Sequence, residues 1–374
     1  MSLRVAIVGA GVGGLTLAIA RRRSNHHVTI FEQTARFARV GADVNLTPNA
    51  VHALNQLGIG SALAKRAASP THRISRTWDS GEETSRIELR AAAEKKYGAS
   101  QLTIHRADLL QELEGAVASE CFQMGHRVTG IKQNADAATV MNGNPVSKPF
   151  DVVVGADGIH SAVRSALFGA ESPEFTGLVS YRGTFARERL QDGPNLDAFT
   201  KWWGPDEARQ IVTFPLSAGQ EIFVFATTPQ DDWREESWTS PGDVEELRAA
   251  YADFHPEARA LLDACTKVTK SALYIRNPMP KWSEGRATLL GDAAHPMTPF
   301  MAQGACMAIE DAVVLARCLE GVERQAIEQA LRKYEQARKE RTSRIQIASR
   351  GNEWLKKGGN ADWVYGYDAW QVPL

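Results

Sequence analysis

The sequence predicts an α/β fold with a parallel nucleotide-binding sheet, an inserted antiparallel β-sheet lobe and a long C-terminal helix. Three observations support this expectation. Residues 1–33 have the order strand, glycine turn, helix, strand, which is typical of a parallel βαβ unit. Residues 175–228 contain short apolar runs separated by turn residues, as in an antiparallel sheet. Residues 324–349 form a long helical stretch near the C-terminus.

Each expected element has a local cause. Residues 4–8 form an apolar strand, and residues 13–23 contain helix formers and end in three arginines, which suit a helix C-terminus. A proline in the first turn favours a helix at 48–57, and a run of valines predicts a buried strand at 151–154. The remaining expected elements are strands at 28–31, 102–104 and 287–290 and helices at 106–117, 303–319 and 324–349.

Strands that are far apart in the sequence must return to one parallel sheet, so the nucleotide-binding domain is expected to be discontinuous. The β-rich lobe is expected to be inserted before its last strand and to bind the substrate. The expected boundaries are 1–70, 100–174 and 280–349 for the nucleotide-binding domain, 71–99 and 175–279 for the β-rich substrate domain, and 350–374 for a C-terminal tail that packs on the body.

Composition excludes several classes of function. The chain has 374 residues and a net charge of −1, so nothing draws it to nucleic acid or to an anionic membrane. Its four cysteines form no CxxC pair, which argues against a metal site and against a disulfide framework. The first apolar run, residues 5–8, is too short for an export signal or a membrane span. We therefore expect a cytoplasmic protein that is a monomer or a homodimer.

Two interpretations fit the basic helical stretch at 324–357. It could be a helix that lies on a membrane surface. However, Ala326, Leu331 and Tyr334 give it a single narrow apolar face, which favours a helix that covers the nucleotide-binding domain.

A glycine turn follows the first strand. Gly9, Gly11 and Gly14 fit the pattern GxGxxG, in which the glycines allow a tight turn, a close approach of a pyrophosphate and close packing of helix on strand. Glu32 follows 18 residues after Gly14, at the end of the second strand, where a carboxylate binds ribose hydroxyls. An acid at this position favours a ribose without a 2′-phosphate, as in FAD or NAD. The alternative is a glycine turn with a purely structural role.

Two further motifs lie far along the chain. Residues 155–164, with the sequence GADGIHSAVR, end a buried strand at Asp157 and start a helix, so backbone donors are expected to face a phosphate. An ordinary Asp-Gly turn with a helix cap is the alternative. Residues 291–296 (GDAAHP) continue into residues 301–311 (MAQGACMAIED) at the start of another helix.

Together these three motifs, spread over residues 9–311, resemble those of group A flavoprotein aromatic hydroxylases, the family of para-hydroxybenzoate hydroxylase and salicylate hydroxylase. The stretches 201–203, 295–297, 301–311 and 363–368 resemble in particular the branch of 6-hydroxynicotinate 3-monooxygenases and salicylate hydroxylase-like enzymes. The resemblance implies a GR2-type, Rossmann-like FAD-binding domain and favours FAD over NAD as the resident cofactor.

The resemblance also implies roles for individual residues. Asp292 would bind the FAD ribityl chain, and Arg106 would lie near the FAD phosphates. The Gly304 and Ala305 amides would lie at a helix N-terminus, which stabilises negative charge on the reduced flavin. Arg39 would lie in a loop that contacts the flavin. The full set of expected cofactor-binding residues is Gly9, Gly11, Gly14, Glu32, Gln33, Arg39, Arg106, Asp157, Asp292, Gly304 and Ala305.

The reaction implied by the resemblance has two halves. NADH or NADPH would reduce FAD. The sequence has no second GxGxxG motif, so a separate domain for this nucleotide is not expected and its binding would be transient. The reduced flavin would then use O2 to hydroxylate a phenol, a hydroxylated aromatic acid or a hydroxypyridine. Two alternatives are an FAD oxidoreductase of this fold that inserts no oxygen and a non-catalytic nucleotide-binding protein.

The expected substrate pocket differs from that of the pyridine branch. That branch has histidine, tyrosine and histidine where this chain has Asn45, Thr213 and Phe300, so its proton-transfer groups are replaced. Arg209 is a candidate partner for a substrate carboxylate, with a solvated strand residue as the alternative. His295 is expected to position the flavin loop. The pocket residues are expected to be Asn45, Tyr181, Arg209, Thr213, Phe214, Pro296 and Phe300, and the candidates for catalysis are Asn45, Arg209, Thr213 and His295.

Overall fold

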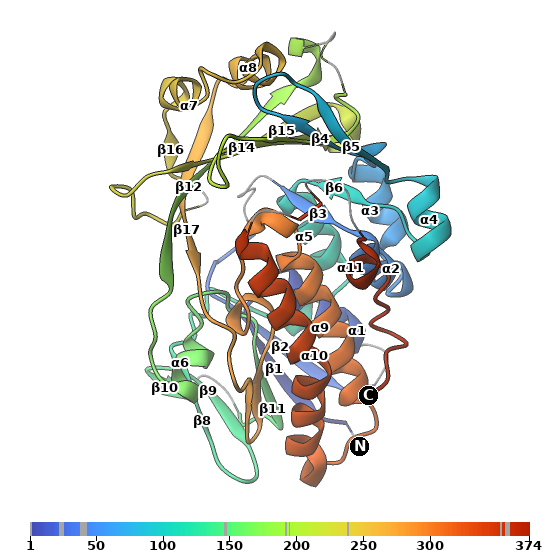
Figure 1. The fold of residues 1–374 in the computed structure, drawn as a ribbon. Helices are drawn as coiled ribbons and strands as arrows, with labels where there is room; N and C mark the ends of the chain where they lie inside the picture. Colours follow the sequence, from blue (N-terminus) through green and yellow to red (C-terminus); the bar gives the residue numbers. More distant parts are fainter. Residues whose placement is uncertain are drawn as a thin grey trace.

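Two large sheets and the helices around them make up the molecule (Figure 1). A six-stranded sheet contains the N-terminal strands, and an eight-stranded sheet lies across the opposite end of the molecule. The computed structural model describes residues 2–21, 26–37, 43–145, 148–190, 193, 195–237, 239–351, 354–355 and 360–374.

The six-stranded sheet has the order β18-β19-β11-β1-β2-β7. All neighbours are parallel except β18 and β19, and strands that are far apart in the sequence share this one sheet, as predicted. The three valines of β11 are fully buried because both faces of the sheet are covered. The strands are β1 (Arg4–Val8), β2 (His27–Glu32), β7 (Phe122–Met124), β11 (Val152–Gly155), β18 (Ser283–Glu284) and β19 (Ala287–Leu289).

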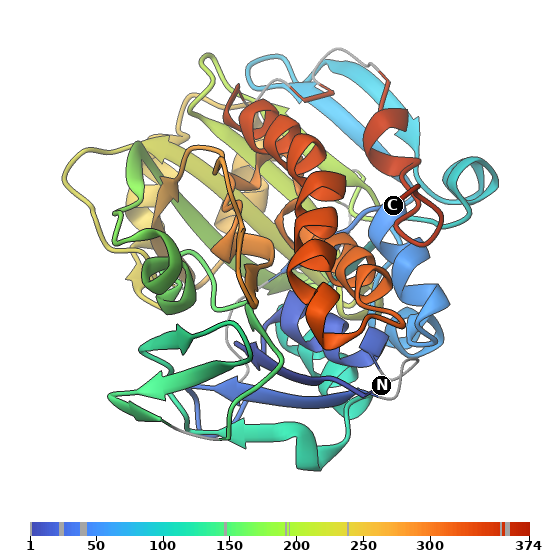
Figure 2. The same cartoon turned by 90° about the horizontal axis from the view of Figure 1, so that it is seen from below.

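Long helices pack on this sheet and on one another. α1 (Val12–Arg21) contacts α5 (Arg106–Gly115) and α9 (Gly304–Cys318), and α9 contacts α10 (Ile327–Ala348). The view in Figure 2 shows α10 running beside α9. The expected helix at 324–349 is interrupted at its start, because Arg324–Ala326 forms a 3-10 turn before α10.

The buried face of α10 is broader than the sequence indicated. Leu331 and Tyr334 are fully buried, as predicted, whereas Ala326 lies before the helix. Arg338 is also fully buried, so the face that packs on α9 contains charge as well as apolar groups. This packing contradicts the membrane-surface interpretation. Within the described ranges, no helix is both long and apolar enough to cross a membrane.

The eight-stranded sheet has the order β16-β17-β12-β15-β14-β13-β4-β5. Its neighbours are antiparallel except for β13 and β4. The prediction of short strands is wrong for β12, which has 13 residues, because the polar residues between its apolar runs also pair with β15. The strands are β4 (His72–Thr77), β5 (Glu83–Glu88), β12 (Glu174–Ala186), β13 (Phe199–Trp203), β14 (Gln210–Leu216), β15 (Glu221–Pro229), β16 (Pro241–Gly242) and β17 (Val268–Ile275).

The two faces of this sheet have different neighbours (Figure 1). We call one of them the outer face. It packs Trp202, Ile211 and Val224 against the helices α7 (Val244–Ala250) and α8 (Pro256–Asp263). The other, the inner face, packs Phe214 against Phe300 of the segment that precedes α9. Because side chains alternate along a strand, residue parity decides which neighbour a side chain meets.

The remaining elements are small. β3 and β6 pair in a separate two-stranded ladder beside β14, so the predicted strand at 102–104 lies outside both large sheets. The tail element α11 contacts α2. These elements are α2 (Pro48–Gln56), α3 (Gly60–Arg66), α4 (Ala91–Tyr97), α6 (Ala162–Phe168), α11 (Asp362–Tyr365), β3 (Val44–Leu46), β6 (Leu102–Ile104), β8 (Gly130–Gln133), β9 (Ala138–Asn142) and β10 (Asn144–Pro145).

Candidate active site

The glycine turn between β1 and α1 has no space for a side chain at Gly9 or Gly14, but it has space at Gly11. Gly9 has φ +102°, and a Cβ there would lie 2.4 Å from the carbonyl oxygen of Ala156. A Cβ on Gly14 would lie 2.1 Å from the oxygen of Gly9. By contrast, a Cβ on Gly11 would meet no atom of the described residues within 4 Å. The turn is therefore locked by Gly9 and Gly14, while its backbone at Gly11 is accessible to a ligand such as a pyrophosphate.

Glu32 lies at the edge of this turn. Its Oε2 accepts a hydrogen bond from the amide of Ala10 at 3.0 Å. Its Oε1 accepts bonds from the amide and the hydroxyl of Thr34, both at 2.9 Å. Gln33, the next residue, is exposed. The carboxylate is thus held beside the turn, at the distance along the chain that the motif predicts.

Asp157 acts as a helix cap. Its carboxylate accepts bonds from the Ser161 hydroxyl at 2.5 Å, the Ala162 amide at 2.7 Å and the Val163 amide at 3.2 Å. The Ser161 hydroxyl in turn accepts the Arg164 amide at 2.9 Å. The expectation that these donors face a phosphate is therefore wrong, because side chains already occupy them. Burial raises the pKa of Asp157, although these bonds oppose the shift.

The third motif lies against the first. A Cβ on Gly13 would lie 2.3 Å from Leu290 and 3.1 Å from the side chain of Ala308, so β19 and α9 approach α1 closely. Beyond Leu290, the carboxylate of Asp292 lies 3.9 Å from the Cβ position of Gly304 at the start of α9. The Asp292 side chain has solvent-accessible surface, yet protein atoms surround it closely enough that desolvation raises its pKa. This combination indicates that the carboxylate lines a hollow.

Arg106 joins the two motifs electrostatically. Burial lowers its pKa, and the negative charges of Asp292 and Glu32 oppose that shift, so both acids lie close to this guanidinium. The locked turn, the open backbone at Gly11 and this trio of charged groups fit a dinucleotide with a diphosphate. Arg39, the other expected cation, lies outside the described residues.

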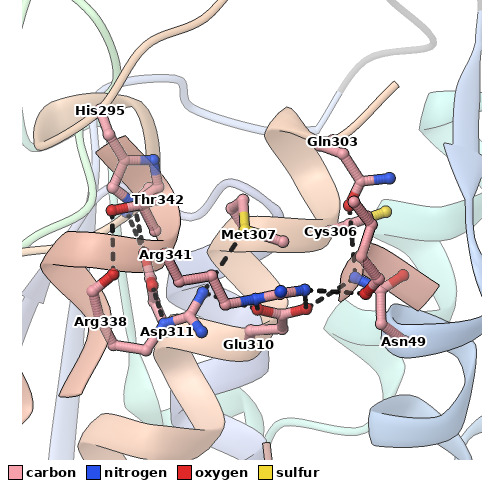
Figure 3. A network of polar contacts seen from close by, with 12 residues as sticks. Asn49, His295, Gln303, Cys306, Met307, Glu310, Asp311, Arg338, Arg341 and Thr342 are labelled. Atoms are coloured by element: carbon pink, nitrogen blue, oxygen red, sulfur yellow. Dashed lines mark hydrogen bonds and ion pairs between the residues drawn. The ribbon is translucent and has the colours of Figure 1, made fainter. Parts of the chain in front are cut away.

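A buried ion-pair network joins His295, which follows Asp292 in the chain, to α9 and α10 (Figure 3). His295 Nε2 lies 2.6 Å from Asp311 Oδ2, and Arg338 pairs with Asp311 at 2.7 Å and with Glu310 at 2.7 Å. Burial favours the neutral form of Asp311, but His295 and Arg338 outweigh it and hold the pKa of Asp311 below its usual range. His295 thus anchors the segment to α9 and α10 through Asp311 and Arg338, and its role in positioning a flavin loop stays a prediction.

The same network reaches the C-terminal tail. Glu310 accepts a bond from Asn49 Nδ2 at 2.6 Å, and Asn49 also donates to Gln303 at 3.3 Å (Figure 3). Arg341 donates to Glu310 at 2.8 and 2.9 Å and to the carbonyl of Val364 at 2.8 Å. Sequence reasoning missed these roles. The only signal was a pair of adjacent acids, residues 310 and 311, in a helix whose one other charged residue is Arg317.

Four of the seven expected pocket residues lie toward the inner face. Phe214 and Phe300 share the inner-face cluster. Asn45, in β3, is 8% exposed and accepts a bond from Gln101 Nε2 at 3.1 Å. Pro296 is buried in the segment anchored by His295, and its carbonyl accepts a bond from α10 at 2.9 Å. These residues frame one region between the sheet, β3 and the segment before α9.

The other three pocket residues lie on the opposite side of the sheet. Tyr181 packs with Leu247 of α7, and burial together with Glu246 raises its pKa. Thr213 lines a cavity on the outer face. Arg209 pairs with Asp206 at 3.4 Å and with Asp253 at 3.3 Å. The prediction that these three line a pocket with Phe300 is wrong, because strand alternation turns Tyr181 and Thr213 outward and surface acids engage Arg209.

Their neighbours on the inner face are cations that sequence reasoning missed. Lys201 is 2% exposed, and its Nζ lies 3.7 Å from the ring centre of Trp203 and 6.0 Å from that of Phe300. The guanidinium of Arg182 lies 5.4 Å from the ring centre of Phe225. Each of these residues is next in sequence to a residue whose side chain faces outward. Assigning the opposite alternation of inward and outward side chains to these strands would have predicted both cations.

Asp43 interacts electrostatically with Arg182 of this group. It precedes Asn45 by two residues. Burial raises its pKa to about 6, and the charge of Arg182 opposes the shift. Within the described part of the chain, no cluster of histidine, cysteine and acidic residues could hold a metal. The arrangement therefore offers aromatic surface, positive charge and one proton acceptor in the same region.

The chain is similar in sequence and in structure to known proteins. Residues 2–348 match the model of the FAD binding domain family. The chain is 38% identical over 372 residues to 6-hydroxynicotinate 3-monooxygenase of Bordetella bronchiseptica, covering 99% of this chain and 97% of that protein. Among solved structures, Klebsiella pneumoniae HpxO with FAD and uric acid has a TM-score of 0.83 at 28% identity, over 96% of this chain and 90% of that one.

A salicylate hydroxylase solved with its substrate has a TM-score of 0.84 at 27% identity, and it covers 98% of this chain and 96% of that chain. The match therefore extends over both sheets. It confirms the resemblance to flavoprotein aromatic hydroxylases and the FAD-binding fold. The chain belongs to the FAD binding domain family, as one of its FAD-dependent aromatic-ring monooxygenases.

Proposed function

We propose that this monooxygenase uses NADH or NADPH to hydroxylate a small aromatic or heteroaromatic ring that carries a negative charge. One observation carries the proposal. The segment from Asp292 to Gly304 is flanked by Leu290 and Ala308, which both lie against Gly13 of α1, and it carries Phe300 on the inner face of the eight-stranded sheet. A flavin bound near Asp292 and Gly304 would therefore face an aromatic substrate that packs against Phe300, in the middle of this segment.

The proposed cofactor contacts divide along the length of FAD. Glu32 would bind the adenosine ribose, and Gly11 and Arg106 would bind the diphosphate. Asp292 would bind the ribityl chain, and the amides of Gly304 and Ala305 would face the flavin at the N-terminus of α9. When bound, FAD supplies the redox chemistry, since it accepts a hydride from the nicotinamide and passes the electrons to O2.

The proposed substrate contacts lie on the inner face. Phe214 and Phe300 would enclose the ring, while Lys201 and Arg182 would bind its carboxylate or phenolate. In support, the relatives' names denote 6-hydroxynicotinate, salicylate and uric acid, all of which readily carry negative charge. The residues that replace the pyridine branch's proton-transfer groups favour a hydroxylated benzoate over a hydroxypyridine here.

The proposed domain division follows the sheets. Residues 1–70, 100–174 and 280–349 would form the FAD-binding domain, and residues 71–99 and 175–279 the substrate domain. The tail, 350–374, would close the side nearest α2, where Trp370 donates to the carbonyl of Ala53 at 3.3 Å. We place the enzyme in the cytoplasm, which fits four cysteines that are all free thiols.

A substrate screen tests the function. Purified protein saturated with FAD would be given NADH or NADPH and a panel of benzoates, salicylates, phenols and hydroxypyridines. We expect one class to stimulate nucleotide oxidation together with O2 uptake, and the product formed under ¹⁸O2 to contain one labelled oxygen. Nucleotide oxidation with an unlabelled product would instead support an FAD oxidoreductase that inserts no oxygen.

Replacing Lys201 by methionine tests the charge on the substrate. We expect KM for an aromatic acid to rise about tenfold to a hundredfold, because a hydrogen bond between charged groups contributes about 1.5–3 kcal/mol. Methionine keeps the volume and the apolar stem, so the fold should persist. The neutral phenol of the same ring is the matched control, and its KM should not change. An equal loss for both substrates would contradict a role in charge recognition.

Replacing Asp43 by asparagine tests the proton acceptor. The pKa of Asp43 is raised to about 6, so its carboxylate is protonated below that pH and able to accept a proton above it. In the wild type, kcat should therefore rise as pH increases through about 6. In Asp43→Asn this rise should disappear and kcat should fall at pH 8. A wild-type profile retained by the variant would exclude Asp43 as the acceptor.

A further inference from the structure

A cavity of about 490 Å³ lies on the outer face of the eight-stranded sheet, between β13, β14 and α8. The sheet separates it from the inner face, where we place the substrate. Its walls combine apolar side chains, including Trp202 and Leu261, with the polar side chains of Arg76, Thr200, Thr213 and Glu257. This volume suits a small ring compound, since ligand pockets span about 300–1,000 Å³.

Arg76 is held in one orientation at the wall of this cavity. Its guanidinium lies 4.1 Å from the ring centre of Trp202. Nε donates to the carbonyl of Gly81 at 2.8 Å, and Nη1 pairs with Glu257 at 2.5 Å. Among the described residues, Nη2 has no hydrogen-bond partner. The guanidinium of Arg76 is thus fixed by stacking and by two polar contacts, while Nη2 remains able to donate a hydrogen bond. This arrangement is preorganised to bind an anion.

Two further polar groups in the wall lack partners. Thr200 is 4% exposed and Trp202 is 1% exposed. Within the described ranges, neither the Thr200 hydroxyl nor the indole N–H of Trp202 has a hydrogen-bond partner. Buried donors of this kind are normally satisfied, so their presence calls for an acceptor that the chain does not supply. Arg189, exposed at the rim, is a second cation, so the lining carries two arginines against the single carboxylate of Glu257.

We propose that this cavity is a second ligand site, which binds a small aromatic carboxylate behind the substrate domain's sheet. The ring would pack against Trp202 and Leu261, and the carboxylate would accept hydrogen bonds from Arg76 and from the threonine hydroxyls. The binding itself does not depend on the proposed function.

The site is coupled to the inner face through β13. Thr200 and Trp202 point outward from this strand, whereas Phe199 and Lys201 point inward. A ligand that shifts β13 by contacting Trp202 would also move Lys201. This part of the inference rests on the proposed substrate contact of Lys201. It makes the cavity a regulatory site whose occupancy changes the affinity for the ring substrate, and the ring substrate must change the affinity of the cavity by the same factor.

Calorimetric binding of benzoate to the FAD-loaded enzyme tests the site. Ala260 lines the cavity from α8, so Ala260→Trp should fill it and weaken this binding by about tenfold or more. Arg259→Trp, which adds the same side chain at an exposed position of the same helix, should bind as the wild type does. Benzamide, the neutral analogue, should bind about tenfold more weakly than benzoate.

Arg76→Gln provides a second variant should Ala260→Trp fail to fold, and it should lose benzoate binding without losing hydroxylation. Comparing benzoate with 2,5-dihydroxybenzoate distinguishes an unhydroxylated acid from a product-like acid as the natural source. Benzoate binding that is unchanged in both Ala260→Trp and Arg76→Gln would overturn the proposal. So would benzoate density found only at the inner face after soaking. Failure of hydroxylation with benzoate still bound in this cavity would reject the proposed function alone.

Discussion

The Arg338→Met enzyme is expected to lose about 3–5 kcal/mol of its free energy of unfolding, because removing one partner from a buried ion-pair network leaves uncompensated charge. Arg338 is fully buried and neutralises both Glu310 and Asp311, each at 2.7 Å. Methionine would leave these carboxylates in the interior of α9 with Arg341 and His295 as their remaining charged partners. Urea unfolding of the FAD-loaded proteins, followed by tryptophan fluorescence, measures the loss.

Arg332→Met is the matched control. It removes the same side chain from the same helix, but Arg332 is 58% exposed on its side chain and pairs with Glu328 at the surface. Such a pair contributes about 0–1 kcal/mol. The deficit of Arg338→Met should shrink as pH falls, since protonation relieves the stranded carboxylates, whose folded-state pKa values are then raised. Equal stability of the two variants would show that the network contributes nothing.

The Gly11→Ala enzyme is expected to fold normally and to bind FAD about tenfold to a hundredfold more weakly, a loss of about 1.4–2.7 kcal/mol. A Cβ on Gly11 meets no described atom within 4 Å, so the apoprotein has room for it. If the diphosphate approaches the backbone at this point, the methyl group occupies the space that the ligand needs. Apoprotein melting and FAD titration by flavin fluorescence together separate the two effects.

Gly115→Ala is the control for this experiment. Gly115 ends α5, and an added Cβ there also has nothing within 4 Å. This variant should match the wild type in both measurements. Unchanged FAD affinity in Gly11→Ala would place the diphosphate elsewhere, whereas a destabilised apoprotein would mean that the turn is tighter than its geometry indicates.

Local sequence patterns were sufficient for the cofactor half of the protein. The GxGxxG turn and the distance from Gly14 to Glu32 depend on interactions within one βαβ unit, and the run of valines in β11 is itself a local pattern. The convergence of the three motifs also follows, because a parallel sheet must bring the carboxyl ends of its strands to one edge. Asp157 is the exception, since its side chain bonds the next helix rather than leaving the amides open.

The sequence alone thus determined the fold class, the cofactor-binding turn and the membership of the flavoprotein hydroxylases. Only the tertiary structure decided which side of the eight-stranded sheet is covered by α7 and α8 and which side faces the proposed substrate site. Alternation makes both faces of β13 and β14 equally plausible, and the covering of one face by α7 and α8 selects Lys201 and Phe214 over Thr213. The pairing of Arg338 with Asp311 is likewise tertiary, because two helices must pack before their buried charges can neutralise each other.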